Sequence, residues 1–125
     1  MSKEGTSFDL EDRLIDFAVR IIRTSESLPK SKVGKHIAGQ LIRSGTSPAP
    51  NYGEAQSAES RADFIHKIKV SLKELRETRI WLIMIVRAGL IKPEAKLKSL
   101  IDENNQLISI FVKSVDTAQK NLRVK

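Results

Sequence analysis

Apolar residues recur every three or four positions along most of this sequence, which is the spacing of helices that each turn one face toward a core. The pattern separates into four segments, and Pro29, Gly89 and Pro93 fall at their limits. No stretch alternates with a period of two, and no Asn-Gly or Asp-Gly pair marks a hairpin. We therefore expect one all-α domain over residues 1–125, with helices at about residues 8–28, 32–43, 48–87 and 93–122.

The third segment is the longest, and it starts with two prolines. Proline lacks an N–H group and holds φ near the helical value, so it fits the first turn of a helix, where N–H groups have no partner. With Thr46 or Ser47 as the cap, Pro48 and Pro50 both lie in that turn. Short connections between consecutive helices favour antiparallel neighbours. The expected fold is an antiparallel, up-and-down four-helix bundle.

The far end of this long helix is apolar on nearly all sides, from Ile80 to Val86. A small bundle does not cover a helix all round, and a large exposed apolar patch is typical of association. The alternative is that a neighbouring helix or the Gly89–Lys92 turn covers the segment. The candidate oligomer interface consists of Ile80, Trp81, Met84 and Ile85.

Four cations lie on or beside the apolar stripe of the same helix: Arg61, Lys69, Arg76 and Arg79. A charge near a core is costly unless it is paired. Three interpretations remain open. The stems are buried at the bundle edges, the charges pair with acids of the last helix (Asp102, Glu103 or Asp116), or they line a channel in an oligomer.

The net charge of +7, from 22 Lys and Arg against 15 Asp and Glu, is compatible with a polyanionic partner or with a charge that serves solubility. No acid occurs between Glu26 and Glu54, and a basic face falls in this gap. Such a face can bind phosphates, remain a solvated surface, or meet acids of a neighbouring subunit such as Asp9, Asp12 and Asp16. Because Tyr52 is the only nearby aromatic residue, stacking on single-stranded bases is not favoured. The candidate nucleic-acid-binding residues are Lys30, Lys32, Lys35, His36 and Arg43.

Signs of catalysis are weak. Cysteine is absent, and both a G-x-S-x-G elbow and a Gly-rich phosphate loop are missing. Asp63-x-x-His66 occurs once, whereas a di-iron bundle needs two such pairs and two further carboxylates. We expect no catalytic site, no metal, no cofactor and no enzymatic activity. The longest apolar run is too short for a membrane span and no secretory signal is visible, so we expect a cytoplasmic protein.

Five phrases recur in a known family: QLIRSGTS, NYGEA, ADFIHKI, LKELRET and WL. On these phrases the chain resembles the bacterial 23S ribosomal RNA intervening-sequence proteins. The resemblance implies a four-helix bundle that assembles into a ring-shaped homo-oligomer, typically a pentamer. The genes of this family lie inside ribosomal RNA intervening sequences, which implies an association with RNA. The chain also looks like the accessory proteins of diversity-generating retroelements, which share the fold and act with nucleic acid.

Two functions follow from these expectations. The first is a non-enzymatic, oligomeric accessory protein that binds the backbone of RNA or DNA through a basic surface. The second is a protein-interaction scaffold that binds a protein partner and no nucleic acid.

Overall fold

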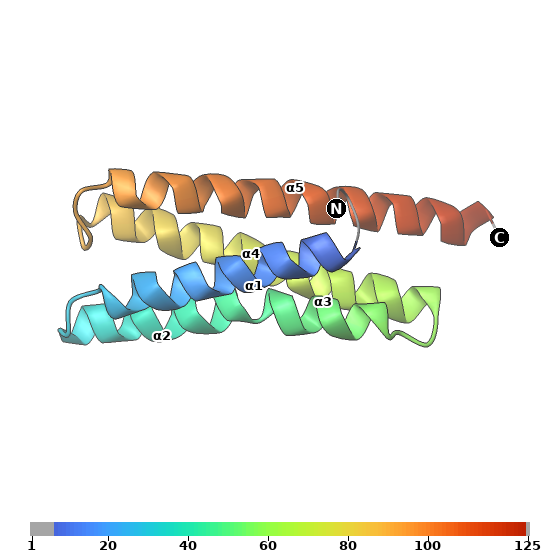
Figure 1. Cartoon of the computed structure of the whole chain (residues 1–125), viewed down its shortest axis with the longest axis horizontal. Coiled ribbons are helices and arrows are strands. Elements are labelled where there is room, and N and C mark those ends of the chain that lie inside the picture. Colours follow the sequence, from blue (N-terminus) through green and yellow to red (C-terminus); the bar gives the residue numbers. More distant parts are fainter. Residues whose placement is uncertain (1–6, 125) are drawn as a thin grey trace.

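The computed structural model describes the backbone of residues 7–124 and the side chains of residues 9–122. This part of the chain is all-α and contains no strand. Two of its helices, α2 and α3, follow each other end to end in Figure 1, so the described residues form four helical rods. The helices are α1 (Ser7–Glu26), α2 (Lys32–Thr46), α3 (Pro48–Gln56), α4 (Arg61–Arg87) and α5 (Ala95–Val124).

The junction between α2 and α3 is a small interruption at Ser47. Its backbone is helical, with φ −68° and ψ −31°. Pro48 and Pro50 cannot donate to the preceding turn, and the Ser47 carbonyl accepts from the backbone N–H of Asn51 at 3.2 Å and from its side-chain amide at 3.0 Å. The prediction that Pro48 begins a helix is confirmed, whereas α2 runs three residues beyond the expected end at residue 43.

The expected helix over residues 48–87 is wrong, because the chain turns at residues 57–60. Ser60 caps the new helix, and its hydroxyl accepts a hydrogen bond from the N–H of Asp63 at 3.0 Å. A salt bridge of 2.7 Å between Lys67 Nζ and Glu54 Oε1 spans this turn. The hydrogen bond that Lys67 donates to Glu54 in this salt bridge raises the pKa of Lys67. Two shorter helices, α3 and α4, therefore replace the one long helix.

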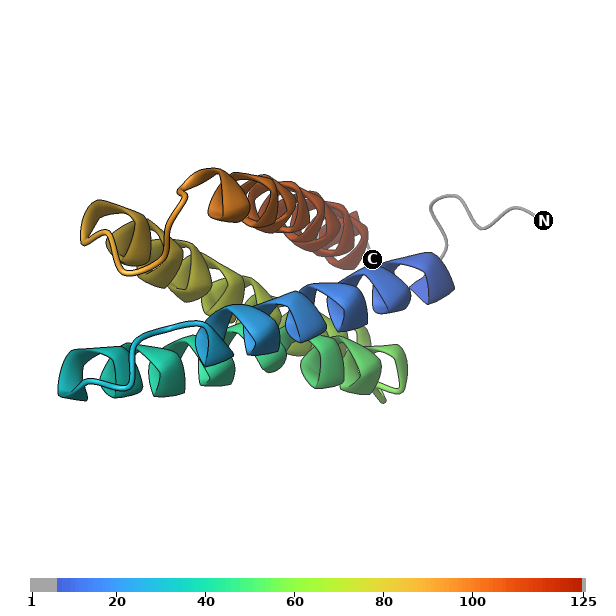
Figure 2. The ribbon, with the colours of Figure 1, turned by 60° about the vertical axis from the view of Figure 1, so that its left-hand side comes forward.

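Loops 27–31 and 88–94 lie at one end of the molecule, and the turn at residues 57–60 lies at the other (Figures 1 and 2). Gly89 ends α4 with φ +65°, and the N–H of Leu90 donates to the carbonyl of Ile85 at 3.1 Å, as expected for a glycine stop. Both α1 and α4 pack against α2, α3 and α5. The helices α1 and α4 therefore occupy diagonal corners of the structure.

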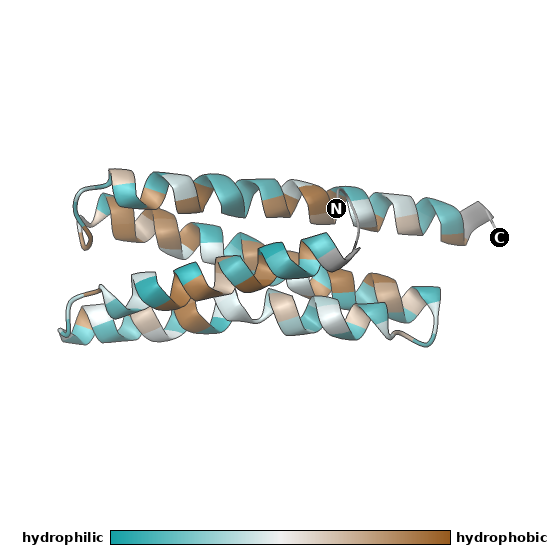
Figure 3. Cartoon of the chain, viewed as in Figure 1, coloured by the Kyte–Doolittle hydropathy of each residue, from teal (hydrophilic) through white to brown (hydrophobic). Residues whose placement is uncertain are grey.

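The core is formed by one apolar stripe from each rod, and in Figure 3 hydrophobic and hydrophilic residues alternate along each helix accordingly. Leu14, Phe17 and Ile21 of α1 are almost completely buried. A β-carbon at Gly45 would lie 2.7 Å from the side chain of Ile21, so glycine permits the close approach of α2 to α1. The other largest fully buried side chains are Leu41, Ile68, Leu75, Leu82, Ile85, Leu97, Leu100, Leu107 and Phe111.

Candidate nucleic-acid interface and oligomer surface

Positive charge is concentrated at the end of the molecule that holds loops 27–31 and 88–94. Residues 20–36 and 87–98, which we call the basic end, contain nine Lys or Arg and two Asp or Glu. This excess of seven equals the net charge of the whole chain, +7, so the remaining charges balance. The nine cations are Arg20, Arg23, Lys30, Lys32, Lys35, Arg87, Lys92, Lys96 and Lys98.

Most of these cations have no carboxylate partner among the described residues. Lys98 is the exception, with Asp102 at 3.8 Å, and Arg20 instead donates to the hydroxyl of Ser99 at 2.9 Å. The other seven are exposed to solvent. Their charge is therefore available to an anion from outside the chain.

A pocket of about 310 Å³ opens at the basic end, between the end of α1 and the start of α5. Its charged lining residues are Arg23, Lys92 and Lys96, and no acid contributes to it. The hydroxyl-bearing residues Thr24 and Ser27 complete the polar side of the pocket. Three cations around one hollow favour an anion the size of a phosphate group.

Four of the five residues predicted to bind nucleic acid lie in the basic end: Lys30, Lys32, Lys35 and His36. Lys30 is in the loop before α2, and Lys32 and Lys35 project from its first turns. Ser31 fixes the start of that helix, because its side chain accepts from the N–H of Gly34 at 3.1 Å. His36 is exposed, and its ring packs edge-on against the ring of Trp81, with 6.1 Å between the ring centroids.

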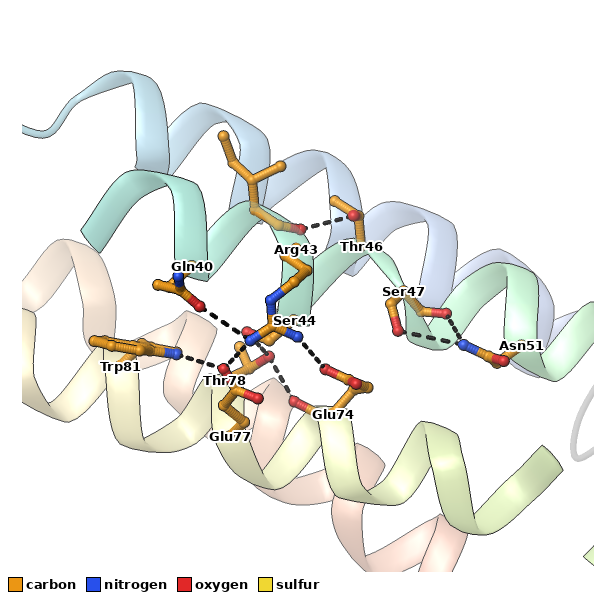
Figure 4. A network of polar contacts seen from close by, with 11 residues as sticks. Gln40, Arg43, Ser44, Thr46, Ser47, Asn51, Glu74, Glu77, Thr78 and Trp81 are labelled. Carbon is orange, nitrogen blue, oxygen red and sulfur yellow. Dashed lines mark hydrogen bonds and ion pairs between the residues drawn. The ribbon is translucent and has the colours of Figure 1, made fainter. Parts of the chain in front are cut away.

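Arg43, the fifth predicted residue, lies apart from the basic end and is already paired (Figure 4). Its guanidinium contacts the carboxylates of Glu74, at 3.1 Å, and Glu77, and it also donates to Gln40. Two carboxylates outweigh one cation here. We therefore correct the prediction that Arg43 belongs to a free basic face.

Below this ion cluster, buried hydroxyl groups join α2 to α4. The side-chain oxygens of Ser44 and Thr78 are 2.9 Å apart, and Thr78 also lies 2.8 Å from the carbonyl oxygen of Glu74. Both residues are completely buried. A threonine hydroxyl carries one proton. Both contacts are therefore hydrogen bonds only if Thr78 donates to one neighbour and the Ser44 hydroxyl donates its own proton to Thr78.

The structure exposes part of the candidate oligomer interface and buries the rest. Ile80 and Met84 are exposed, and Trp81 is partly covered, with its indole N–H donating to Glu77 at 2.9 Å. Ile85 is completely buried in the core, so its assignment to an oligomer interface is wrong. The reason is that α4 packs against α2 on one side and α5 on the other, and its buried face is wide enough to include Ile85.

The four cations that the sequence placed beside the core, Arg61, Lys69, Arg76 and Arg79, are all exposed. Two of the three acids suggested as their partners have other contacts, and Asp116 forms no ion pair among the described residues. Glu103 binds Arg13 at 2.8 Å, and Asp102 lies near Lys98. The cations on the outer side of α4 thus have no carboxylate partner within the described residues.

Among the described residues, Asp63 and His66 do not belong to a group of side chains that could hold a metal ion. Within the part of the chain that the structure describes, no three His, Asp or Glu side chains come close enough to hold an ion. Asp63 is in the first turn of α4 and His66 is exposed. Likewise, no helix among the described residues is both long and apolar enough to cross a membrane.

Sequence reasoning did not include Arg23, Arg87, Lys92 and Lys96 in the candidate surface. Arg23 and Arg87 come from the ends of α1 and α4, Lys92 from the loop before α5, and Lys96 from the first turn of α5. The signal available in the sequence was the expected up-and-down topology, which places the loop after the first helix and the loop before the last helix at one end of the molecule. This arrangement brings together charges about 60 residues apart in the sequence.

Comparisons with known proteins agree on one family. Residues 7–113 match the family described as 23S rRNA-intervening sequence protein. A similar solved structure is a protein of unknown function from the S23 ribosomal protein family of Bacteroides thetaiotaomicron. It is 32% identical, the match covers 84% of this chain and 96% of that chain, and the TM-score is 0.78. No curated protein matches the sequence.

Proposed function

Because the chain belongs to the family of 23S rRNA-intervening sequence proteins, we propose that it is a non-enzymatic accessory protein that binds the backbone of RNA or DNA. In this proposal the functional unit is a cytoplasmic homo-oligomer of antiparallel four-helix bundles, with a pentamer as the expected size. The phosphates bind at the basic end, and no base is read individually.

The observation that carries this proposal is the distribution of charge. The basic end holds an excess of seven positive charges, and eight of its nine cations lack a carboxylate partner among the described residues. Phosphate contacts by Lys and Arg release condensed counterions, which supplies most of the free energy of non-specific binding. A homo-oligomer repeats the basic end in every subunit, and this repetition raises the avidity for a long polyanion.

The test is a titration of RNA and DNA binding against salt, with labelled single strands and duplexes. We expect the logarithm of the binding constant to fall linearly with the logarithm of the salt concentration. Each lost phosphate contact lowers the steepness by about 0.9 for a duplex and about 0.7 for a single strand. The double variant Lys32→Ala/Lys35→Ala should therefore show a shallower dependence, and so should Lys92→Ala/Lys96→Ala.

A matched control removes two lysines from elsewhere. Lys113 and Lys120 are exposed residues of α5 outside the basic end, so Lys113→Ala/Lys120→Ala should leave the salt dependence unchanged. An equal loss in this control would mean that total charge matters and its location does not. Absence of binding to any strand at low salt would refute the proposal.

A second candidate function is a scaffold that binds proteins and no nucleic acid. The observation in its favour is a set of large apolar side chains that remain exposed in the described chain, among them Val33, Ile42, Ile80 and Met84. This candidate predicts partners whose binding is insensitive to Lys32→Ala/Lys35→Ala. The salt titration therefore distinguishes the two functions.

A further inference from the structure

The outer side of α1 carries an apolar stripe with an acid at each end. Ile15, Val19 and Ile22 are 45%, 38% and 40% exposed, although Leu14, Phe17 and Ile21 of the same helix are buried. The spacing from Glu11 through these three residues to Glu26 is four, four, three and four, so all five lie on one side of the helix. We call these five residues the α1 face.

The acids of the α1 face have no cation partner within the described residues. Glu11 and Glu26 are exposed, and so is Asp16, which lies beside the stripe. The nearby cation Arg13 is engaged elsewhere, because its guanidinium binds Glu103 of α5 at 2.8 and 3.0 Å. That hydrogen bond raises the pKa of Arg13. The α1 face itself therefore combines exposed apolar area with two unpaired acids and contains no cation, although the exposed Arg23 of the basic end lies beside Glu26.

The outer side of α4 has the opposite charge in a similar layout. Ile80 and Met84 are 52% and 44% exposed. Lys73 and Arg76 precede Ile80 by seven and four residues, and Arg87 follows Met84 by three, so the five residues share one side of the helix. All three cations are exposed and lack a carboxylate partner among the described residues. We call Lys73, Arg76, Ile80, Met84 and Arg87 the α4 face.

The two faces match in length as well as in charge. At 1.5 Å per residue, the α1 face spans about 22 Å from Glu11 to Glu26, and the α4 face spans about 21 Å from Lys73 to Arg87. Each has an apolar centre with charges at both ends. Ridges of two helices with these features can pack so that the apolar centres meet and opposite charges lie together.

A single copy cannot bring these two faces together. Because α1 and α4 occupy diagonal corners, each packing against α2, α3 and α5, their outer sides point away from each other. A symmetric contact is also disfavoured. Two α1 faces would bring acids against acids, and two α4 faces would bring cations against cations, and such like-charge contacts are unfavourable.

We infer that the α1 face of one copy docks on the α4 face of another copy, in a head-to-tail contact. The inference rests on the homo-oligomer of the proposed function and names the two surfaces that form it. A contact between two different surfaces leaves each new copy with one free surface of each kind. If the rotation between neighbouring copies adds up to a full turn, a ring closes. If it does not, the copies form an open filament.

The inference is tested by two variants that each carry a new charge on one face. Val19→Asp places a carboxylate in the α1 face, and Met84→Asp places one in the α4 face. Both positions are exposed, so the fold should be retained, as checked by circular dichroism and thermal unfolding. Native mass spectrometry should show the wild type as an oligomer and each variant alone as a monomer.

Mixing the two variants gives the decisive measurement. The Val19→Asp chain keeps an intact α4 face and the Met84→Asp chain keeps an intact α1 face, so the mixture should form a one-to-one dimer and nothing larger. As a matched control, Thr117→Asp introduces the same charge on an exposed position of α5 and should leave the oligomer unchanged. Two monomeric variants that do not combine would overturn the head-to-tail contact.

Other outcomes separate this inference from the proposed function. A wild type that is monomeric at all concentrations overturns both the contact and the proposed oligomer. Variants that keep the wild-type size overturn the assignment of the faces and leave the oligomer intact. If Met84→Asp keeps its size but loses RNA binding, the α4 face binds nucleic acid and the inference is overturned. The effect of Lys32→Ala/Lys35→Ala on RNA binding is a separate measurement, and its result does not depend on these three outcomes.

Discussion

The two halves of α2 carry similar charges and use them in different ways. In the first half, Lys32 and Lys35 point to solvent at the basic end, without a carboxylate partner among the described residues. In the second half, Arg43 lies between Glu74 and Glu77 of α4. The acids of the neighbouring helix therefore decide whether a cation of α2 can bind an external ligand. The first half should affect binding, and the second half should affect stability.

The largest loss of stability is expected from a substitution in the second half of α2, where this helix packs closely on α1. Gly45→Ala brings a β-carbon within 2.7 Å of the buried Ile21 side chain. Overpacking costs about 1–3 kcal/mol, and the gain in helix propensity returns less than about 1 kcal/mol. Urea denaturation should show a lower free energy of unfolding.

The control for this variant is in the same helix. A β-carbon at Gly39 meets nothing within 4 Å, so Gly39→Ala should raise the free energy of unfolding by about 0.5–1 kcal/mol. Similar changes for the two variants would contradict the tight packing of α2 on α1. Neither variant should change the salt dependence of RNA binding.

The next effect concerns the buried hydroxyl pair. Thr78→Val retains the shape of the side chain but leaves the Ser44 hydroxyl without its partner 2.9 Å away. An unsatisfied buried polar group costs about 1–3 kcal/mol, and we expect a loss of that order in urea denaturation. Thr117→Val, at an exposed position of α5, should change the stability by less than about 0.5 kcal/mol. A loss below that limit at Thr78 would contradict the role of the pair.

Much of the fold was predictable, because each rod buries one face and the apolar period records that face. The helices α1 and α5 lie within about two residues of their expected limits, and Gly89 ends α4 as expected. The turn at residues 57–60 was missed, because it contains neither glycine nor proline and Ala58 continues the apolar spacing. The signal that could have revealed it is Ser60 followed three residues later by Asp63, a helix-start pattern.

The candidate site was predictable only in part, for a different reason. A helical wheel groups Arg43 with Lys32 and Lys35, but it contains no information on the acids of α4, which are 31 and 34 residues further along. The same limit applies to Ile85, whose burial depends on how α2 and α5 flank α4. Properties of one helix were therefore predictable, whereas properties that need a partner helix required the three-dimensional arrangement.

A smaller effect is expected when Arg43 is removed. Its ion pairs are half exposed, and pairs of this kind contribute about 0.2–1 kcal/mol. Arg43→Ala should therefore lower the free energy of unfolding by about that amount. RNA binding should keep its salt dependence, in contrast to Lys32→Ala/Lys35→Ala. A shallower dependence for Arg43→Ala would mean that both halves of α2 contact phosphates.

The smallest effect on stability, and the sharpest test of the comparison, comes from removing the acids and leaving the arginine. Glu74→Gln/Glu77→Gln keeps the shape of both side chains and an acceptor for the Trp81 indole, so the free energy of unfolding should change by less than about 1 kcal/mol. The charge of Arg43 is then no longer neutralised. If pairing with the two acids is the only reason why Arg43 does not contact phosphates, the salt dependence of RNA binding should become steeper, by about 0.7–0.9 for one added phosphate contact. The control Glu59→Gln/Asp116→Asn removes the same charge at two exposed acids that have no cation partner among the described residues, and it should leave the dependence unchanged. An unchanged dependence in Glu74→Gln/Glu77→Gln would mean that distance from the basic end, and not pairing, keeps Arg43 out of the interface.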